Sequence, residues 1–159
     1  MYVTALQPLT LEKVRTTGQA EPEPLKTGFA PSSAIPSWSP RDDWILYSDG
    51  GAPKLISIDG RTTRDLKLPA PTLCAFGQSG VRLYCLQPSP SGPSVFEADL
   101  EGNRVREIGL IASELRPSTV VNPGLRLSLT PDGQSLSYSN YKVSANRWLL
   151  EGLDKIALP

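Results

Sequence analysis

The candidate site residues that the sequence offers are carboxylates, two cysteines and three tryptophans, and histidine is absent. Without an imidazole the chain alone cannot supply Ser-His-Asp or Cys-His catalysis, a histidine-ligated metal site or a histidine pH switch. The acidic candidates are two close pairs, Asp42 with Asp43 and Glu21 with Glu23. Paired carboxylates can act as general acid and base. These pairs lie in turn-like and proline-rich segments, where a solvated surface is the expected setting.

Cys74 and Cys85 flank a glycine-containing turn. In the tightest hairpin Cys74 stands opposite Leu83 and only diagonal to Cys85, at about 7–8 Å, at or beyond the reach of a relaxed disulfide. We therefore expect two small unbridged residues, and a disulfide is the alternative. A metal site lacks its third and fourth soft ligands.

The three tryptophans could line a carbohydrate platform. Trp38 and Trp44 fall on expected strands, where large aromatic side chains usually pack between sheets, so we expect both in the core. Trp148 lies near the C-terminal end of the sequence and is expected to be more open.

Two turn segments, "SPRDD" and "TPDG", could suggest calcium loops. An EF-hand-like loop needs a run of oxygen ligands and a terminal bidentate Glu, and both are missing. The second segment also resembles the Asp-box of sialidases without its Thr and Trp, and that turn is structural. No catalytic, cofactor or metal-binding residue is therefore assigned, and no cofactor is expected.

The composition excludes several classes of protein. Of 159 residues, 39% are apolar and 20% charged, which is typical of a globular domain. Sixteen basic residues balance sixteen acidic ones without a basic stripe, so nucleic acid is not an expected partner. There is no run of eighteen apolar residues, so no transmembrane helix is expected, and the N-terminal residues have no signal-peptide pattern. The sequence leaves the compartment, cytoplasm or periplasm, open.

A repeat organises the chain. Three segments align without gaps, each with a turn at its centre, small residues at both ends and tyrosine in the eleventh place, as Tyr47, Tyr84 and Tyr138. The turn residues Pro, Asp and Gly suit their positions because Pro presets one φ angle and Gly tolerates positive φ. The segments are "SWSPRDDWILYS" (37–48), "CAFGQSGVRLYC" (74–85) and "SLTPDGQSLSYS" (128–139).

The first two copies are each followed by two alternating segments divided by Asp-Gly or Glu-Gly, a usual hairpin signal, and the third by one matching segment. Four short antiparallel strands repeated at about 40 residues are typical of β-propeller blades. A β-sandwich is the alternative, although it does not require the same turn and tyrosine to recur. The following segments are 53–60 with 62–69, 94–102 with 104–111, and 146–153.

The stretches "WSPRDDWILYSDGGAPKLISIDG" and "LTPDGQSLSYSN" resemble TolB-type propeller repeats over roughly residues 30–153. The ending "LTPDGQSLSYSNYKVSANRWLLEGL" is similar to the C-terminal blade of bacterial propellers attached to winged-helix regulators or serine/threonine kinases. The second copy has lost both Trp-Ser and Pro-Asp-Gly. The resemblance implies a fold and a repeat family but no particular ligand.

We thus expect an all-β chain, a single β-propeller segment over 1–159 with about three and a half four-stranded antiparallel blades. A fragment of a larger propeller is the first expectation, because an open half-propeller would expose strand edges; a ring completed by self-association is the second and a small closed ring the third. We expect residues 1–29 to hold the last strands of a preceding blade, at 2–6 and 11–15, and a connector. Residues 30–69 are expected to form a blade, 70–124 a blade with a long loop, and 125–159 a final partial blade.

Two segments are candidates for interaction. Residues 20–33 have polyproline character and are expected to be a connector. The long insertion 111–124, with Arg116, is the better candidate because long loops in compact domains are often functional.

The sequence therefore favours a non-enzymatic module that binds a protein or small ligand at a propeller face, as the sensor or scaffold part of a bacterial regulatory protein. One alternative is the gating propeller of a prolyl-oligopeptidase-type or other hydrolase whose catalytic domain lies elsewhere. Another is a self-associating propeller, in which copies of the chain form a homo-oligomer that completes the ring.

Overall fold

The computed structural model describes residues 9–18, 21–30, 36–111, 127–130 and 134–138. None of these residues lies in a helix, and their strands form four antiparallel sheets, so the all-β class is confirmed. The strands are β1 (Leu9–Lys13), β2 (Glu23–Phe29), β3 (Ser37–Trp38), β4 (Trp44–Asp49), β5 (Ala52–Ser57), β6 (Thr63–Asp65), β7 (Leu73–Phe76), β8 (Leu83–Gln87), β9 (Ser94–Ala98), β10 (Arg104–Leu110), β11 (Leu127–Leu129) and β12 (Leu136–Tyr138).

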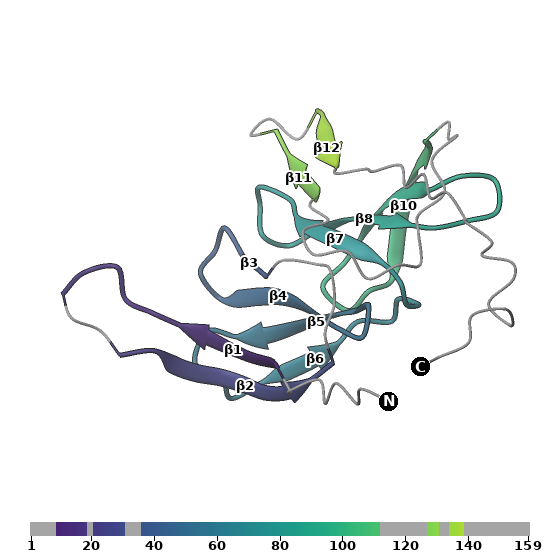
Figure 1. The fold of residues 1–159 in the computed structure, drawn as a ribbon. Helices are drawn as coiled ribbons and strands as arrows, with labels where there is room; N and C mark the ends of the chain where they lie inside the picture. Colours follow the sequence, from purple (N-terminus) through teal and green to yellow (C-terminus); the bar gives the residue numbers. More distant parts are fainter. Residues whose placement is uncertain (1–8, 19–20, 31–35, 112–126, 131–133, 139–159) are drawn as a thin grey trace, which may run out of the picture.

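Two of the sheets have four strands each, and in both the strands follow one another in chain order. β3-β4-β5-β6 contains the first sequence copy and β7-β8-β9-β10 the second. The predicted Asp-Gly and Glu-Gly turns are present between the last two strands of each sheet, where Gly60 and Gly102 have φ of 73° and 85°. Local hairpins therefore build both sheets (Figure 1).

A two-stranded sheet, β1-β2, precedes them, and this corrects the expectation that 20–33 is a connector. Leu25 and Phe29 are buried on β2, and their burial favours a strand over solvated polyproline. Pro24 is tolerated because a strand at a sheet edge can lack one backbone donor. β1 overlaps the strand predicted at 11–15, and the strand predicted at 2–6 lies outside the described residues.

The first core cluster lies between the β1-β2 sheet and the β3–β6 sheet. It joins side chains from β1 and β2 to Ile45, Tyr47 and Ile56 of β4 and β5. Phe29 and Tyr47 meet edge to face, with ring centroids 5.6 Å apart. The cluster consists of Leu11, Leu25, Phe29, Ile45, Tyr47 and Ile56.

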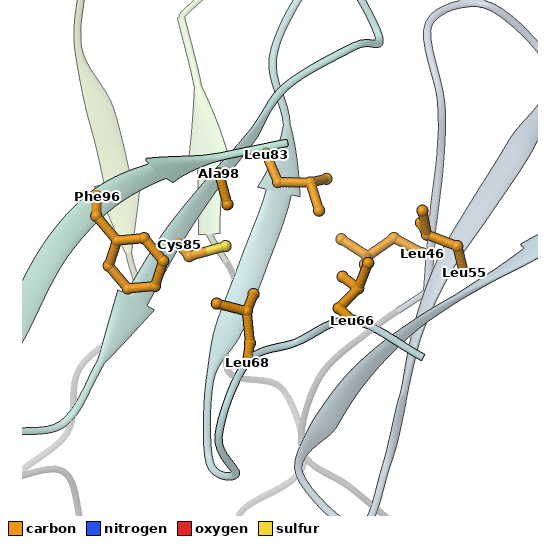
Figure 2. Packing of buried hydrophobic residues seen from close by; sticks show 8 residues of the cluster. All are labelled: Leu46, Leu55, Leu66, Leu68, Leu83, Cys85, Phe96 and Ala98. Atoms are coloured by element: carbon orange, nitrogen blue, oxygen red, sulfur yellow. The ribbon is translucent and has the colours of Figure 1, made fainter. Parts of the chain in front are cut away.

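The second core cluster lies between the two four-stranded sheets. Leu46 and Leu55 come from the β3–β6 sheet, and Figure 2 shows them approaching residues of β8 and β9. Leu66 and Leu68, from the segment after β6, fill the space between the sheets. The cluster consists of Leu46, Leu55, Leu66, Leu68, Leu83, Cys85, Phe96 and Ala98.

The strand β4 shows why the sheets stack. Side chains alternate along a strand, so Ile45 and Tyr47 enter the first cluster while Leu46 enters the second. All three are at most 4% exposed. A strand buried on both faces needs a covering layer on each side. The β1-β2 sheet covers one face of β4, and the β7–β10 sheet covers the other.

Turns of the β7–β10 sheet also touch the preceding sheet. The backbone N–H of Lys67, just after β6, donates to the carbonyl of Glu101 in the β9–β10 turn at 3.0 Å. A Cβ at Gly102 in that turn would lie 2.4 Å from the Lys67 nitrogen, and one at Gly80 in the β7–β8 turn would lie 2.7 Å from Arg41. Glycine therefore permits the close approach of neighbouring sheets.

The first strands of the successive sheets lie side by side. β7 contacts β3 on one side and β11 on the other (Figure 1). At the opposite edge of its sheet, β10 is exposed along its whole length. We call β3, β7 and β11 the inner strands.

Candidate functional site

The three hairpins that the repeat predicts share one turn, but the gapless alignment places it one residue off in the second copy. The backbone N–H of Ser39 donates to the carbonyl of Trp44, Gly77 to Arg82 and Thr130 to Ser135, at 2.8–2.9 Å. Each bond closes a four-residue turn. Gly80 is therefore equivalent to Asp42, and both have positive φ, 68° and 54°.

This shift corrects the tyrosine equivalence. Tyr47 and Tyr138 correspond to Cys85, whereas Tyr84 corresponds to Leu46. Tyr47 is 3% exposed in the first core cluster, and Tyr84 is half-buried on the opposite face of its sheet from Cys85. Burial raises the pKa of Tyr47.

Cys74 and Cys85 form a disulfide, which the sequence did not favour. They stand directly opposite each other, with Cα atoms 4.2 Å apart, whereas Leu83 pairs with Phe76. Because Gly77 and Arg82 are a hydrogen-bonded pair, alternation makes Cys74 and Cys85 a non-hydrogen-bonded pair, the kind in which Cα atoms approach most closely. The expectation of an unbridged pair was wrong because the turn sits one residue later than expected.

The tryptophans behave differently from one another. Trp44 is half-buried against the second core cluster with the guanidinium of Arg64 4.8 Å from its ring centroid, so its predicted place between sheets is confirmed. Trp38 is 52% exposed on the short edge strand β3, and its predicted core position was wrong. Trp38 pairs with Ile45, whose side chain enters the first cluster.

The predicted carboxylate pairs do not converge. Asp43 accepts a hydrogen bond from the Ser39 hydroxyl at 2.7 Å and pairs with Arg41 at 3.5 Å. Asp42 and Glu21 are exposed, and Glu23 pairs with Lys13 at 3.2 Å. Among the described residues, no group of three or more His, Cys, Asp or Glu side chains could hold a metal ion.

One charged cluster went unnoticed in the sequence. Lys54 on β5 lies 3.1 Å from Asp49 and 3.2 Å from Asp65, on the two neighbouring strands. The Ala30 backbone N–H, which donates to Asp49, lowers the pKa of that carboxyl, and the bond to Asp49 raises the pKa of Lys54. The cluster fastens the β4–β5 hairpin to the segment that follows β2.

Two aspartates organise the turns between third and fourth strands. Asp59 accepts from the backbone of Arg61, and Asp99 from the backbones of Glu101 and Asn103. The hydrogen bond from Ser57 lowers the pKa of Asp59. Burial alone would raise the pKa of Asp99, but the hydrogen bonds outweigh it and lower the pKa. Both carboxylates serve as turn acceptors.

A pocket of about 210 Å³ lies between β1, β2 and β4. The Phe29–Tyr47 pair forms part of its wall. Ser48 also lines it, and its buried hydroxyl has no hydrogen-bond partner. Because side chains alternate along β4, the Ser48 side chain lies on the opposite face from Tyr47. Its hydroxyl therefore does not offer the pocket a hydrogen-bonding group. The lining residues are Leu9, Thr10, Leu11, Phe29, Pro36, Tyr47 and Ser48.

The two ends of the sheets differ in how their loops vary. At the constant end, which carries turns 40–43 and 78–81, the turns have the same length. At the opposite end, the β4–β5 turn has two residues, 50–51, and the β8–β9 loop has six, 88–93. We call this the variable end; it also carries the connectors around Ala30 and Pro71, which contact the turn through Gly50 and Gly51.

The remaining predicted candidates lie outside the described residues: Arg116 with nearly all of the long insertion, and Trp148. The described part of the chain contains no helix long and apolar enough to cross a membrane. No protein-family model, curated protein or solved structure matches the chain.

Proposed function

We propose that the chain is a non-enzymatic binding module built from propeller-type blades. Following the TolB-type resemblance, it would be the sensor or scaffold part of a bacterial regulatory protein, and it would bind a protein or small ligand. Three features support the blade arrangement: sheets stacked face to face, shared four-residue turns, and inner strands lying side by side. In a propeller the first strand of every blade faces the common axis, so neighbouring first strands meet there.

The variable end is the proposed binding face, and the difference in loop length carries this choice. Turns that keep the same length in successive units serve the fold, whereas loops that differ on a rigid scaffold are free to recognise a ligand. The 88–93 loop has six residues where the preceding unit has two. Its backbone is held by a bond from Gly92 to the carbonyl of Ser89 at 3.1 Å, so it presents a fixed shape.

Amide NMR spectra of the labelled protein, recorded against a panel of peptides and small molecules, test the binding face. Ligands that bind should shift amides of the variable end, such as those of Gly50, Gly92 and Thr72. Shifts gathered at the constant end around Gly80 and Gly60 would contradict the proposed face. Absence of any shift across the panel would count against a ligand-binding role.

A loop exchange provides the matched control. Replacing 88–93 by Gly-Gly, as in the 50–51 turn, should abolish the shifts while Phe96 and Leu83 keep their native chemical shifts. Retained binding after the exchange would show that the loop does not recognise the ligand.

The same protein should leave chromogenic ester and peptide substrates at the background hydrolysis rate. Turnover that follows the purified chain would contradict the non-enzymatic assignment.

A further inference from the structure

The disulfide holds one of the inner strands. Cys74 lies on β7 and Cys85 on β8, and β7 is the edge strand of its sheet. β7 contacts β3 and β4 of the preceding sheet and also β11 of the following hairpin. The strand fastened by the bond is therefore the one through which three successive units meet.

The two sulfur atoms have different surroundings. Cys85 is fully buried in the second core cluster, beside Leu68 and Phe96 (Figure 2). Cys74 packs against the same cluster but is half-buried. A reagent reaching the bond from solvent therefore meets Cys74 first.

The equivalent position in the third hairpin uses a noncovalent pair. There Leu127 stands opposite Tyr138, one pair beyond the hydrogen-bonding serines Ser128 and Ser137. The same place in the second hairpin carries two cysteines instead. A covalent link at this position can be opened and closed chemically, whereas a Leu–Tyr pair cannot.

β7 has little else to hold it to β8. Its ladder has four residue pairs, from Leu73–Leu86 to Phe76–Leu83. Of its side chains, only that of Ala75 is buried, at 8% exposed, and the others, including Cys74 and Phe76 at the margin of the second core cluster, are half-buried. β8 and β9, in contrast, place Leu83, Phe96 and Ala98 in the second core cluster without any exposure.

We infer that the Cys74–Cys85 disulfide is a redox clasp, which a dithiol opens to release β7 and the contact of β7 with β11. A thiolate of the reductant attacks Sγ of Cys74, the sulfur–sulfur bond breaks, and Cys85 leaves as a thiolate that takes up a proton. The second thiol of the reductant then displaces Cys74 as a thiol and closes a cyclic disulfide. Two electrons and two protons pass from the dithiol to the protein.

This inference is independent of the proposed binding function. The redox clasp requires that reduction loosens β7 and leaves β8 and β9 in place. These two strands keep their buried apolar contacts when the disulfide is open. A disulfide that merely stabilises the whole fold would instead affect all strands alike.

Hydrogen exchange of the full chain, with and without an excess of dithiothreitol, tests the clasp. Ala75 and Tyr84 form the hydrogen-bonded pair next to the disulfide, so the Ala75 amide reports on β7 and the Phe96 amide on the sheet centre. After reduction Ala75 should exchange at least about ten-fold faster, while Phe96 changes by less than about two-fold.

Equal acceleration of both amides would overturn the clasp and leave a general stabilising bond. A bond that stays oxidised in excess dithiol, as measured by thiol titration, would overturn it as well. The double variant Cys74→Ala/Cys85→Ala is the control for side effects of the reductant, since its Ala75 exchange should not respond to the dithiol. A response in that variant would show that the effect in the native protein does not come from the disulfide.

Discussion

At the scale of single residues, the molecule depends on backbone positions where a side chain would not fit. Gly102 has a φ of 85° and lies against the backbone of Leu66 and Lys67, at the seam between the two four-stranded sheets. Gly18 has a similar φ of 79°, with nothing within 4 Å of an added Cβ. Substitutions at these two glycines therefore distinguish two contributions to stability: the strain of a side chain at positive φ, and the clash of a Cβ with neighbouring atoms.

Gly102→Ala should lower the free energy of unfolding by about 2–4 kcal/mol, because strain and a clash with backbone act together. Gly18→Ala should cost about 1 kcal/mol, from the conformation alone. Urea denaturation of both variants measures the difference. Equal losses would show that the sheets do not meet at Gly102.

Asp42 is the non-glycine residue with positive φ among the described positions, at a turn site where the second copy has Gly80. Asp42→Gly should therefore raise the free energy of unfolding by about 0.5–1 kcal/mol, since it removes left-handed strain. Asp43→Gly is the matched control, and it should destabilise because Asp43 accepts a bond from Ser39. Thermal unfolding of the two variants measures both changes in stability. A loss of stability in Asp42→Gly would contradict the turn geometry.

Two residue-level predictions, the equivalence of Tyr84 with Tyr47 and the unbridged cysteines, were wrong for the same reason. The second copy was aligned on Tyr84, whereas the glycine that takes positive φ marks the true position of the turn. Gly80 would have given the correct register, and with it the direct pairing of Cys74 and Cys85. Trp38 could not be placed from sequence, because burial of a strand residue depends on which neighbouring elements cover that face.

At the scale of elements, the alternating segments and the Asp-Gly and Glu-Gly turns were sufficient to locate β5, β6, β9 and β10. β2 was missed because the prolines of segment 20–33 suggest polyproline, and the burial that favours a strand comes from contacts with β4 and β5. Long-range contacts of this kind leave no local pattern. The variable end was equally hidden, since it emerges only when the turn registers of two sheets are compared.

The hairpin β4–β5 should make stability depend on pH. The pKa of Asp49 is lower in the folded chain than in the unfolded chain, through the Ala30 N–H and Lys54. Its contribution is therefore present above the unfolded pKa, about 3.9, and is lost as the pH falls through the lower folded value. Asp49→Asn should therefore flatten the loss of stability as the pH falls below about 4.

Urea midpoints of the native chain and of Asp49→Asn across this range measure the effect. Asp65→Asn is the comparison, because that side chain is 81% exposed and solvent screens its ion pair with Lys54. An unchanged slope in Asp49→Asn would show that the Asp49 contacts do not stabilise the folded chain.

At the scale of the whole molecule, the stacked sheets can be arranged in two ways. In a propeller the sheets fan out from an axis, so inner strands are closer together than outer strands. In a sandwich or a straight stack neighbouring sheets keep a nearly constant spacing of about 10 Å. The inner strands β3, β7 and β11 lie side by side, which favours the fan. The direct test compares the spacing at the two edges.

Pulsed electron–electron distance measurements between spin labels on two pairs of equivalent exposed sites supply that comparison. The inner pair is Pro40→Cys with Gln78→Cys, the first residues of the shared turns. The outer pair is Thr62→Cys with Asn103→Cys, whose carbonyls accept the backbone bonds that close the turns between the third and fourth strands. The native cysteines are bonded to each other and do not take the label. A longer distance for the outer pair than for the inner pair is the predicted result, and equal distances or a longer inner distance would contradict the propeller arrangement.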